Sequence, residues 1–148
     1  MSSEQTQTLP LKSSDFDANF NLTNPNAKKR TVIIFYAPWC GHCNNFKPVY
    51  EELAKMANQG MLGNDVTIAT VNGDNEKNED GILNLLRNSP NAEFKVDGFP
   101  TVVSYYNYKY YSTYAPDTDP QKREQYRTKE DLAEYIQGIG SAPVQYIQ

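Results

Sequence analysis

The sequence has 148 residues, which is enough for one domain with a single hydrophobic core. Its net charge is −4, and its longest run of basic residues is only Lys28-Lys29-Arg30, which argues against nucleic acid as a partner. No stretch approaches the roughly 20 apolar residues of a membrane-spanning helix, so we also expect no membrane insertion.

The first half of the chain alternates between predicted strands and helices. Residues 8–12 fit a short edge strand, and residues 14–20 fit a short helix with a hydroxyl cap. In the strand expected at residues 31–36, residues 32–36 have no polar alternation, as expected of a central strand that is covered on both faces. Residues 41–58 then repeat apolar side chains at the three- and four-residue spacing of a helix.

The second half continues this alternation and ends with a hairpin and a helix. Its predicted elements are a buried strand at 66–71, a helical face around 82–86, a strand at 101–106, its hairpin partner at 108–114 and a final helix capped by Thr128. Residues 115–125 are rich in proline and charge, which indicates an exposed insertion. The order predicts an α/β fold with a central mixed sheet flanked by helices on both faces.

We expect a single domain at residues 8–140, with a disordered N-terminus at 1–7 and a tail at 141–148. The first eight residues lack the apolar segment of a secretory signal, and the last four are no retention signal for the endoplasmic reticulum. The expected location is therefore the cytoplasm, or a virion or viral factory if the chain is viral. Residence in the lumen of the endoplasmic reticulum would need a targeting segment that has been removed.

Both cysteines and the only histidine lie at the start of the long predicted helix, in Trp39-Cys40-Gly41-His42-Cys43. Free N–H groups at a helix N-terminus stabilise an anion, which favours a thiolate at Cys40. Cys43 follows one turn later on the same face, so its sulfur can attack a mixed disulfide formed on Cys40. His42 adds a donor or a positive charge near the Cys40 sulfur, which makes the disulfide a better oxidant.

Three other interpretations of the cysteines remain. A zinc site needs four ligands, and the chain offers only Cys40, His42 and Cys43, so we expect no metal and no cofactor. Two cysteines could also be plain core residues, because they cannot build a disulfide framework. The remaining alternative is a redox-inactive binding or adaptor module.

The run Phe-Tyr-Ala-Pro-Trp-Cys-Gly-His-Cys at 35–43 resembles the active-site signature of the protein disulfide isomerase branch of the thioredoxin superfamily. Residues 98–101, Gly-Phe-Pro-Thr, resemble the Gly-Tyr-Pro-Thr loop of that family. The resemblance implies a thioredoxin fold and a thiol–disulfide oxidoreductase or isomerase. Its substrates would be protein thiols and disulfides, with a redox partner that the sequence does not identify.

The same resemblance implies roles for single residues. Cys40 would be an exposed nucleophile and Cys43 the thiol that resolves the mixed disulfide, tuned by His42. A cis bond would precede Pro100 and place it opposite the thiols. The implied substrate groove consists of Trp39, Gly41, Phe99 and Pro100.

Arg127, just before the final predicted helix, matches a family arginine that moves toward the second cysteine and lowers its pKa. The other interpretation is a surface arginine near a helix start. A buried acid and a lysine usually accompany this site, and the chain has Ile34 and Thr70 in their places. Either charge alone would be buried and unpaired, which is costly, so it makes electrostatic sense that both are absent together. We therefore expect slow release of the mixed disulfide by Cys43.

A tyrosine-rich run occupies residues 104–114. Aromatic residues favour strands and pair across them, so a hairpin is the expected structure. Tyrosine is also enriched in interfaces, which leaves a partner or dimer surface as the alternative. We expect a monomer, with dimerisation through this hairpin as the other outcome.

Overall fold

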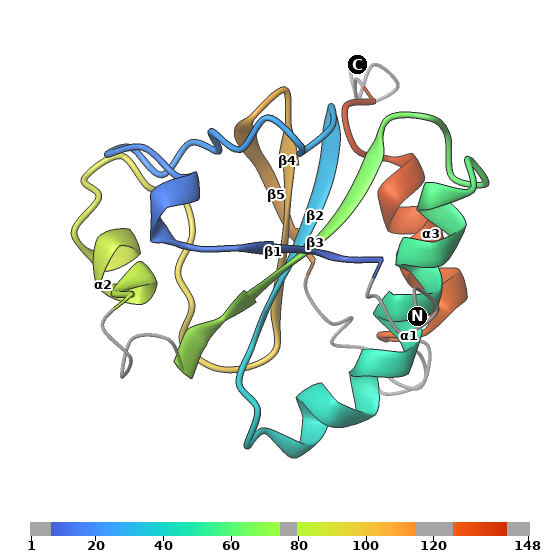
Figure 1. Cartoon of the computed structure of the whole chain (residues 1–148), viewed down its shortest axis with the longest axis horizontal. Coiled ribbons are helices and arrows are strands. Elements are labelled where there is room, and N and C mark those ends of the chain that lie inside the picture. Colours follow the sequence, from blue (N-terminus) through green and yellow to red (C-terminus); the bar gives the residue numbers. More distant parts are fainter. Residues whose placement is uncertain (1–6, 75–79, 115–125, 142–148) are drawn as a thin grey trace, which may run out of the picture.

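A five-stranded mixed sheet with the strand order β1-β3-β2-β4-β5 forms the centre of the protein (Figure 1). The computed structural model describes residues 7–74, 80–114 and 126–141. The strands are β1 (Leu9–Leu11), β2 (Arg30–Tyr36), β3 (Val66–Asn72), β4 (Thr101–Tyr106) and β5 (Lys109–Tyr114). β1 and β2 run parallel to β3, while β4 pairs antiparallel with both β2 and β5.

Helices cover both faces of the sheet, which confirms the predicted architecture. α1 (Gly41–Asn58) and α3 (Lys129–Gln137) lie together on one side, and α2 (Ile82–Arg87) lies on the other (Figure 1). Within the described residues, no helix is both long and apolar enough to cross a membrane. The expected insertion at 115–125, and almost all of both expected terminal segments, lie outside the described residues.

The central strand β2 is buried on both faces, as its unbroken apolar run predicts. Val32 and Ile34 face the core beneath α1 and α3, whereas Ile33 and Phe35 face the core on the α2 side. Alternate side chains of one strand therefore anchor two separate cores. This double anchoring fixes where β2 ends and where α1 begins, which is where both cysteines lie.

The helix predicted at 14–20 is wrong. Only one 3-10 turn forms, at Ser13–Asp15, and Phe16 then bridges to Leu22 in an antiparallel pair. The carboxylate of Asp17 accepts the backbone N–H groups of Asn19 at 2.9 Å and Asn21 at 2.8 Å. Such local side-chain bonds compete with the helical ladder, and here the turn prevails.

The tyrosine-rich run forms the expected β4–β5 hairpin. Its hydroxyl groups join the hairpin to distant loops: Tyr105 donates to the Phe20 carbonyl at 2.7 Å, and Tyr108 donates to the Ala27 carbonyl at 2.8 Å. These bonds give the tyrosines a role in the fold. A partner or dimer surface on this hairpin stays a prediction.

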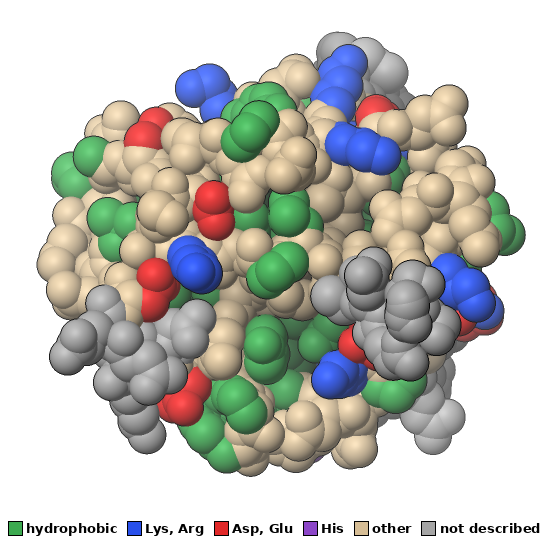
Figure 2. All heavy atoms as spheres, viewed as in Figure 1, with side chains coloured by type: hydrophobic (Ala, Val, Ile, Leu, Met, Phe, Trp, Pro, Cys, Tyr) green, Lys and Arg blue, Asp and Glu red, His purple; other side chains and the backbone are tan. Residues whose placement is uncertain are grey.

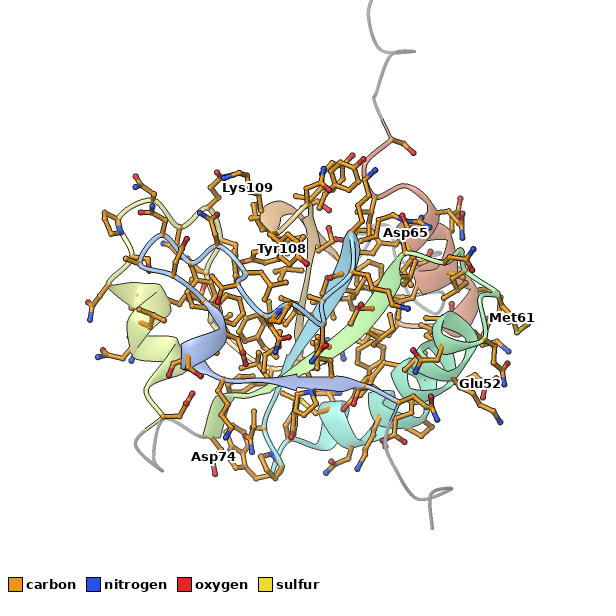
Figure 3. All side chains as sticks on the ribbon, turned by 45° about the horizontal axis from the view of Figure 1, so that its top comes forward. Glu52, Met61, Asp65, Asp74, Tyr108 and Lys109 are labelled. Carbon is orange, nitrogen blue, oxygen red and sulfur yellow. The ribbon has the colours of Figure 1, made fainter. Side chains whose placement is uncertain are left out.

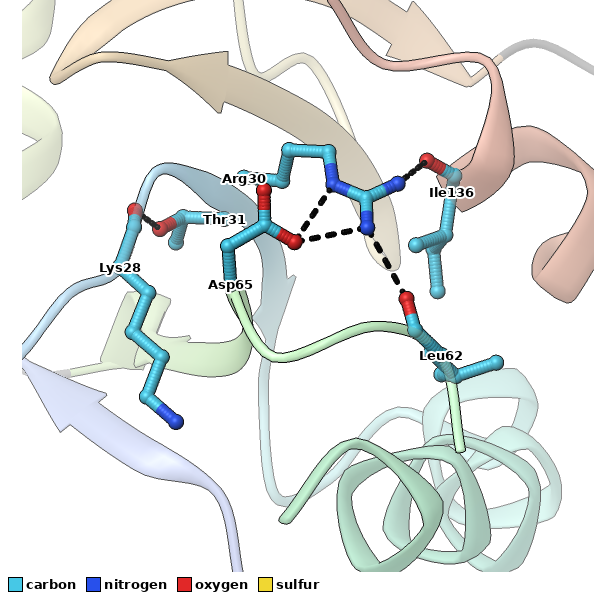
Figure 4. Close-up of polar contacts among 6 residues, drawn as sticks. All are labelled: Lys28, Arg30, Thr31, Leu62, Asp65 and Ile136. Carbon is cyan, nitrogen blue, oxygen red and sulfur yellow. Dashed lines mark hydrogen bonds and ion pairs between the residues drawn. The ribbon is translucent and has the colours of Figure 1, made fainter. Parts of the chain in front are cut away.

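Arg30, at the start of β2, joins three parts of the structure (Figure 4). Its guanidinium contacts the Asp65 carboxylate at 2.7 Å, the Leu62 carbonyl at 3.0 Å and the Ile136 carbonyl at 3.1 Å. The hydrogen bond from Arg30 holds the pKa of Asp65 below its usual value. Strand β2, the loop before β3 and helix α3 are thus connected at one point.

We expect Arg30→Met to lower the free energy of unfolding by about 2 to 3 kcal/mol, because it leaves two carbonyls and a carboxylate without their donor. Urea unfolding followed by circular dichroism measures the change. Lys28→Met is the matched control, since the Lys28 side chain is exposed and lies away from this network. Equal losses in both variants would contradict the assigned role of Arg30.

Candidate active site

The two cysteines lie where β2 delivers the chain to the N-terminus of α1. Cys40 is the N-cap residue of this helix, and its Sγ accepts the backbone N–H of Cys43 at 3.1 Å. An N–H donor and the positive end of the helix dipole therefore act on the same sulfur, which favours negative charge there. The predicted position of the thiol pair is confirmed.

Cys40 is less accessible than an exposed nucleophile would be. Its relative exposure is 7%, against 2% for Cys43, and both thiols are free. The pair forms a small buried cluster with Ala37, against which Tyr36 and Phe99 pack. The expectation of an exposed Cys40 is therefore wrong, because these neighbours cover most of its surface, although Cys40 remains the more accessible thiol.

The loop before β4 supplies the opposite wall of the site. The peptide bond between Phe99 and Pro100 is cis, as the family resemblance implies. The Cys40 Sγ lies 3.5 Å from the Phe99 carbonyl oxygen, so this turn contacts the thiol pair directly. A side chain at Gly73 would place its first carbon 2.4 Å from the Phe99 ring. The absence of a side chain at Gly73, which the sequence did not mark as functional, lets Phe99 reach this position.

Trp39 stands at the mouth of the site with 66% of its surface exposed. Its ring meets the Phe99 ring edge to face with centroids 5.8 Å apart, and its Nε1 donates to the Asp74 carboxylate at 3.3 Å. Asp74 lies just beyond the end of β3 (Figure 3). This contact joins segments 35 residues apart, and sequence spacing alone gave no sign of it.

His42 and Gly41 are exposed on the first turn of α1. Among the described residues, His42 forms no hydrogen bond with the Cys40 sulfur. Its charge can act on Cys40 only through space, so the tuning role of His42 remains a prediction. Within the described ranges, no group of three or more His, Cys, Asp or Glu residues is arranged to hold a metal ion.

Burial raises the pKa of Cys43 to about 11, and the neighbouring Cys40 side chain adds to the rise. The Ala37 backbone and the charge of Arg127 oppose it. The second thiol is therefore protonated at neutral pH and must lose its proton before it can attack a disulfide. This same step, the release of the mixed disulfide by Cys43, is expected from the sequence to be slow.

Arg127 approaches the site from the segment before α3. Its guanidinium carbon lies 4.8 Å from the Tyr126 ring centroid and 6.0 Å from that of Phe46, and its Nε is buried without a hydrogen-bond partner among the described residues. The hydroxyl of Tyr114 accepts the Arg127 backbone N–H at 2.8 Å and donates to the Asp131 carboxylate. The residue is thus partly buried and held in place, unlike a free surface arginine.

Ile34 and Thr70 pair in register across β2 and β3, where relatives are expected to hold an acid and a lysine. Ile34 is 1% exposed and belongs to the core beneath α1. Ile34 and Thr70, which replace the acid and the lysine of the family pattern, are therefore neighbours in the structure. Strand β2 therefore provides no carboxylate at position 34 that could accept the proton of Cys43.

The pKa of Cys43 predicts a loss of stability at high pH. A thiol that keeps its proton in the folded state up to about pH 11, against an ordinary value of 9.0, binds more protons folded than unfolded in this window. The stability of the reduced protein should therefore fall between about pH 9 and pH 11. Urea unfolding at several pH values measures the slope, and Cys43→Ala should reduce it to the part that comes from tyrosines such as Tyr36 and Tyr50, whose pKa values are also raised by burial. An unchanged slope in Cys43→Ala would contradict the raised pKa.

Comparisons with known proteins agree with this geometry. A family model described as Thioredoxin matches residues 8–137. Protein disulfide-isomerase erp38 of Neurospora crassa is 38% identical over 85 residues, which cover 57% of this chain and 20% of the relative. Protein disulfide-isomerase of Aspergillus oryzae is 33% identical over 121 residues, which cover 82% of this chain and 19% of the relative.

A solved structure of human ERp44, form I, shares the fold with a TM-score of 0.64 at 20% identity, covering 94% of this chain and 31% of that chain. The chain spans only 20% and 19% of the length of the two curated relatives. The family model, in contrast, covers the sheet, the three helices of the described residues, both cysteines and Pro100. The chain belongs to the thioredoxin family.

Proposed function

We propose that the protein is a thiol–disulfide oxidoreductase that exchanges disulfides with protein substrates through the Cys40–Cys43 couple. One observation carries this proposal: the Cys40 Sγ accepts a helix N-terminal N–H at 3.1 Å beside the Phe99 carbonyl at 3.5 Å. A plain core cysteine needs neither contact. The names of the two curated relatives support the same class of reaction.

The reaction has two exchange steps. The Cys40 thiolate attacks a substrate disulfide, forms a mixed disulfide and expels one substrate sulfur as a thiolate, which takes up a proton. Cys43 then loses its proton and attacks the Cys40 sulfur. This forms the Cys40–Cys43 disulfide and releases the second substrate sulfur, so the substrate gains two electrons and the enzyme loses two. The reverse sequence oxidises a substrate dithiol.

The residues around the thiols supply the docking surface in this proposal. Trp39 and Phe99 form an aromatic pair at the mouth of the site. Pro100 follows directly after the Phe99 carbonyl that contacts the Cys40 sulfur. The exposed Gly41 leaves room for a substrate chain above the first turn of α1. His42 would stabilise the leaving Cys40 thiolate by its charge, and Arg127 would lower the barrier to deprotonation of Cys43.

The direction of electron flow follows from the reduction potential. Reductases such as thioredoxin lie near about −270 mV, and isomerases lie near about −180 mV. A charged His42 favours the higher value, because it stabilises the reduced form. We therefore propose activity toward the oxidising, isomerase-like end, with a monomer as the active species.

Reduction of insulin disulfides by the protein in dithiothreitol tests the proposal. We expect turbidity from the released insulin chain with the wild type and only the uncatalysed rate with Cys40→Ser. The redox-inactive adaptor is the second hypothesis, and it predicts the uncatalysed rate for both proteins. That result would overturn the proposed function.

A further inference from the structure

A cavity of about 410 Å³ lies against the second cysteine. Its walls come from the start of β1, the ends of β2 and β3 and the first turns of α1, and include Cys43, Tyr36 and Thr70. Figure 2 shows this face hollowed beneath β1, with apolar side chains on the floor of the hollow and charged side chains beside it. The mechanism above leaves the cavity without a role.

Three hydroxyl groups border the cavity without a hydrogen-bond partner in the described part of the chain. Tyr36, Tyr50 and Thr70 line it, and none of their hydroxyls forms a hydrogen bond with another described residue. A cavity of this size has room for several water molecules, and the three hydroxyls on its wall can form hydrogen bonds with them. Water in the cavity would reach the side of Cys43 that lines it.

A carboxylate stands on the same wall. Glu51 lines the cavity with its side chain 43% exposed, and Lys47 lies 4.0 Å from its Oε2. Tyr50 also lines the cavity, and burial raises the pKa of its hydroxyl to about 12, with smaller contributions from the charges of Tyr36, Glu51 and Cys43. The cavity therefore connects the thiol to an acceptor that is open to solvent.

We propose that water in this cavity carries the proton of Cys43 to the Glu51 carboxylate, in place of a buried acid at position 34. The inference rests on the proposed function, since the proton is lost in the second exchange step. The thiol proton passes to water and the last water protonates Glu51, which releases it to solvent. The Cys43 thiolate then closes the disulfide with Cys40, and the substrate sulfur leaves as a thiolate.

The charged and titratable groups around this path are few. Lys47 and Tyr50 flank Glu51 on α1, while Cys40, Tyr36 and Arg127 surround the Cys43 end. Lys47 lies 4.0 Å from the Glu51 carboxylate, and Tyr50 keeps its proton at neutral pH because burial raises its pKa. Glu51 carries the only carboxylate among the described residues that line the cavity. It acts on Cys43 through water and not by contact.

Stopped-flow reaction of the reduced protein with oxidised glutathione separates the two exchange steps. The first step speeds up with glutathione concentration, whereas the second sets a plateau rate that is independent of it. We expect Glu51→Gln to lower the plateau about tenfold at pH 7, less than the 100-fold or more of a directly contacting base, and to leave the first step unchanged. Thr70→Val, which removes one hydroxyl, should also lower the plateau.

Glu52→Gln is the matched control, because Glu52 is the next residue of α1 and points away from the cavity into solvent (Figure 3). The deficit of Glu51→Gln should vanish as the pH approaches about 11, where Cys43 ionises without an acceptor. A plateau equal in Glu51→Gln and Glu52→Gln at every pH would overturn the proton path. A missing first step in the wild type would instead refute the proposed function.

Discussion

Replacing Cys43 with serine should turn the protein into a covalent trap for its substrates. Cys40 would still attack a substrate disulfide, but no second thiol would remain to release the mixed disulfide. We expect the trapped species to accumulate to nearly one equivalent, and turnover to fall at least 1,000-fold, the roughly 10³-fold or larger loss seen when a catalytic group is removed. The substrate is ribonuclease that has been reduced, denatured and then reoxidised. Mass spectrometry after acid quenching measures both the trapped species and the turnover.

Cys40→Ser provides the contrast, because Cys43 is almost fully buried and its pKa is raised to about 11. We expect no mixed disulfide in this variant at neutral pH. Equal trapping through either cysteine would show that the assigned order of attack is wrong. The order itself follows from geometry, since only Cys40 occupies the helix N-cap.

Ile34→Glu should destabilise the protein by about 3 to 5 kcal/mol at pH 8, the cost of a buried charge without a partner. Ile34 lies in the core beneath α1, and Thr70 beside it carries no charge. Burial raises the pKa of such a carboxyl, so the loss should shrink as the pH falls toward about 4, where both states hold the proton. Urea unfolding over this pH range measures it.

The register of β2 and β3 also predicts a rescue. In the double variant Ile34→Glu with Thr70→Lys, the two side chains lie on paired positions and can form an ion pair. We expect the double variant to recover a large part of the loss that the two single variants cause together. Ile34→Gln separates polarity from charge, since its loss should not depend on pH. Additive losses in the double variant would show that positions 34 and 70 are not neighbours.

The parts of the fold with strong local signals were predictable. β2 and β3 appear as unbroken apolar runs, and α1 extends over the predicted residues 41–58 because apolar spacing and the N-cap agree. The short turn at 13–15 was not predictable as such, because the Asp17 side chain captures backbone groups that a helix would use. A turn held by local hydrogen bonds of this kind has the same amino-acid composition as a helix start, so composition does not distinguish the two.

The candidate site likewise combines features that the sequence predicts with features that it does not. The Cys40–Cys43 pair and the N-cap position follow from spacing, whereas the cis bond before Pro100 was expected only through the family resemblance. Tyr50 and Glu51 appeared in the sequence as ordinary helix positions. Their role emerges from a cavity between segments far apart in the chain, for which the sequence has no local signal. The contact between Trp39 and Asp74 has the same origin.

The equilibrium of the Cys40–Cys43 couple in glutathione buffers tests the central claim most directly. The fraction of reduced protein, counted by mass spectrometry after alkylation, should follow a single two-electron curve with about 30 mV for each tenfold change. We expect its midpoint between about −270 and −180 mV, nearer the upper value. A protein that forms no Cys40–Cys43 disulfide in any of these buffers would contradict the assignment of a redox couple.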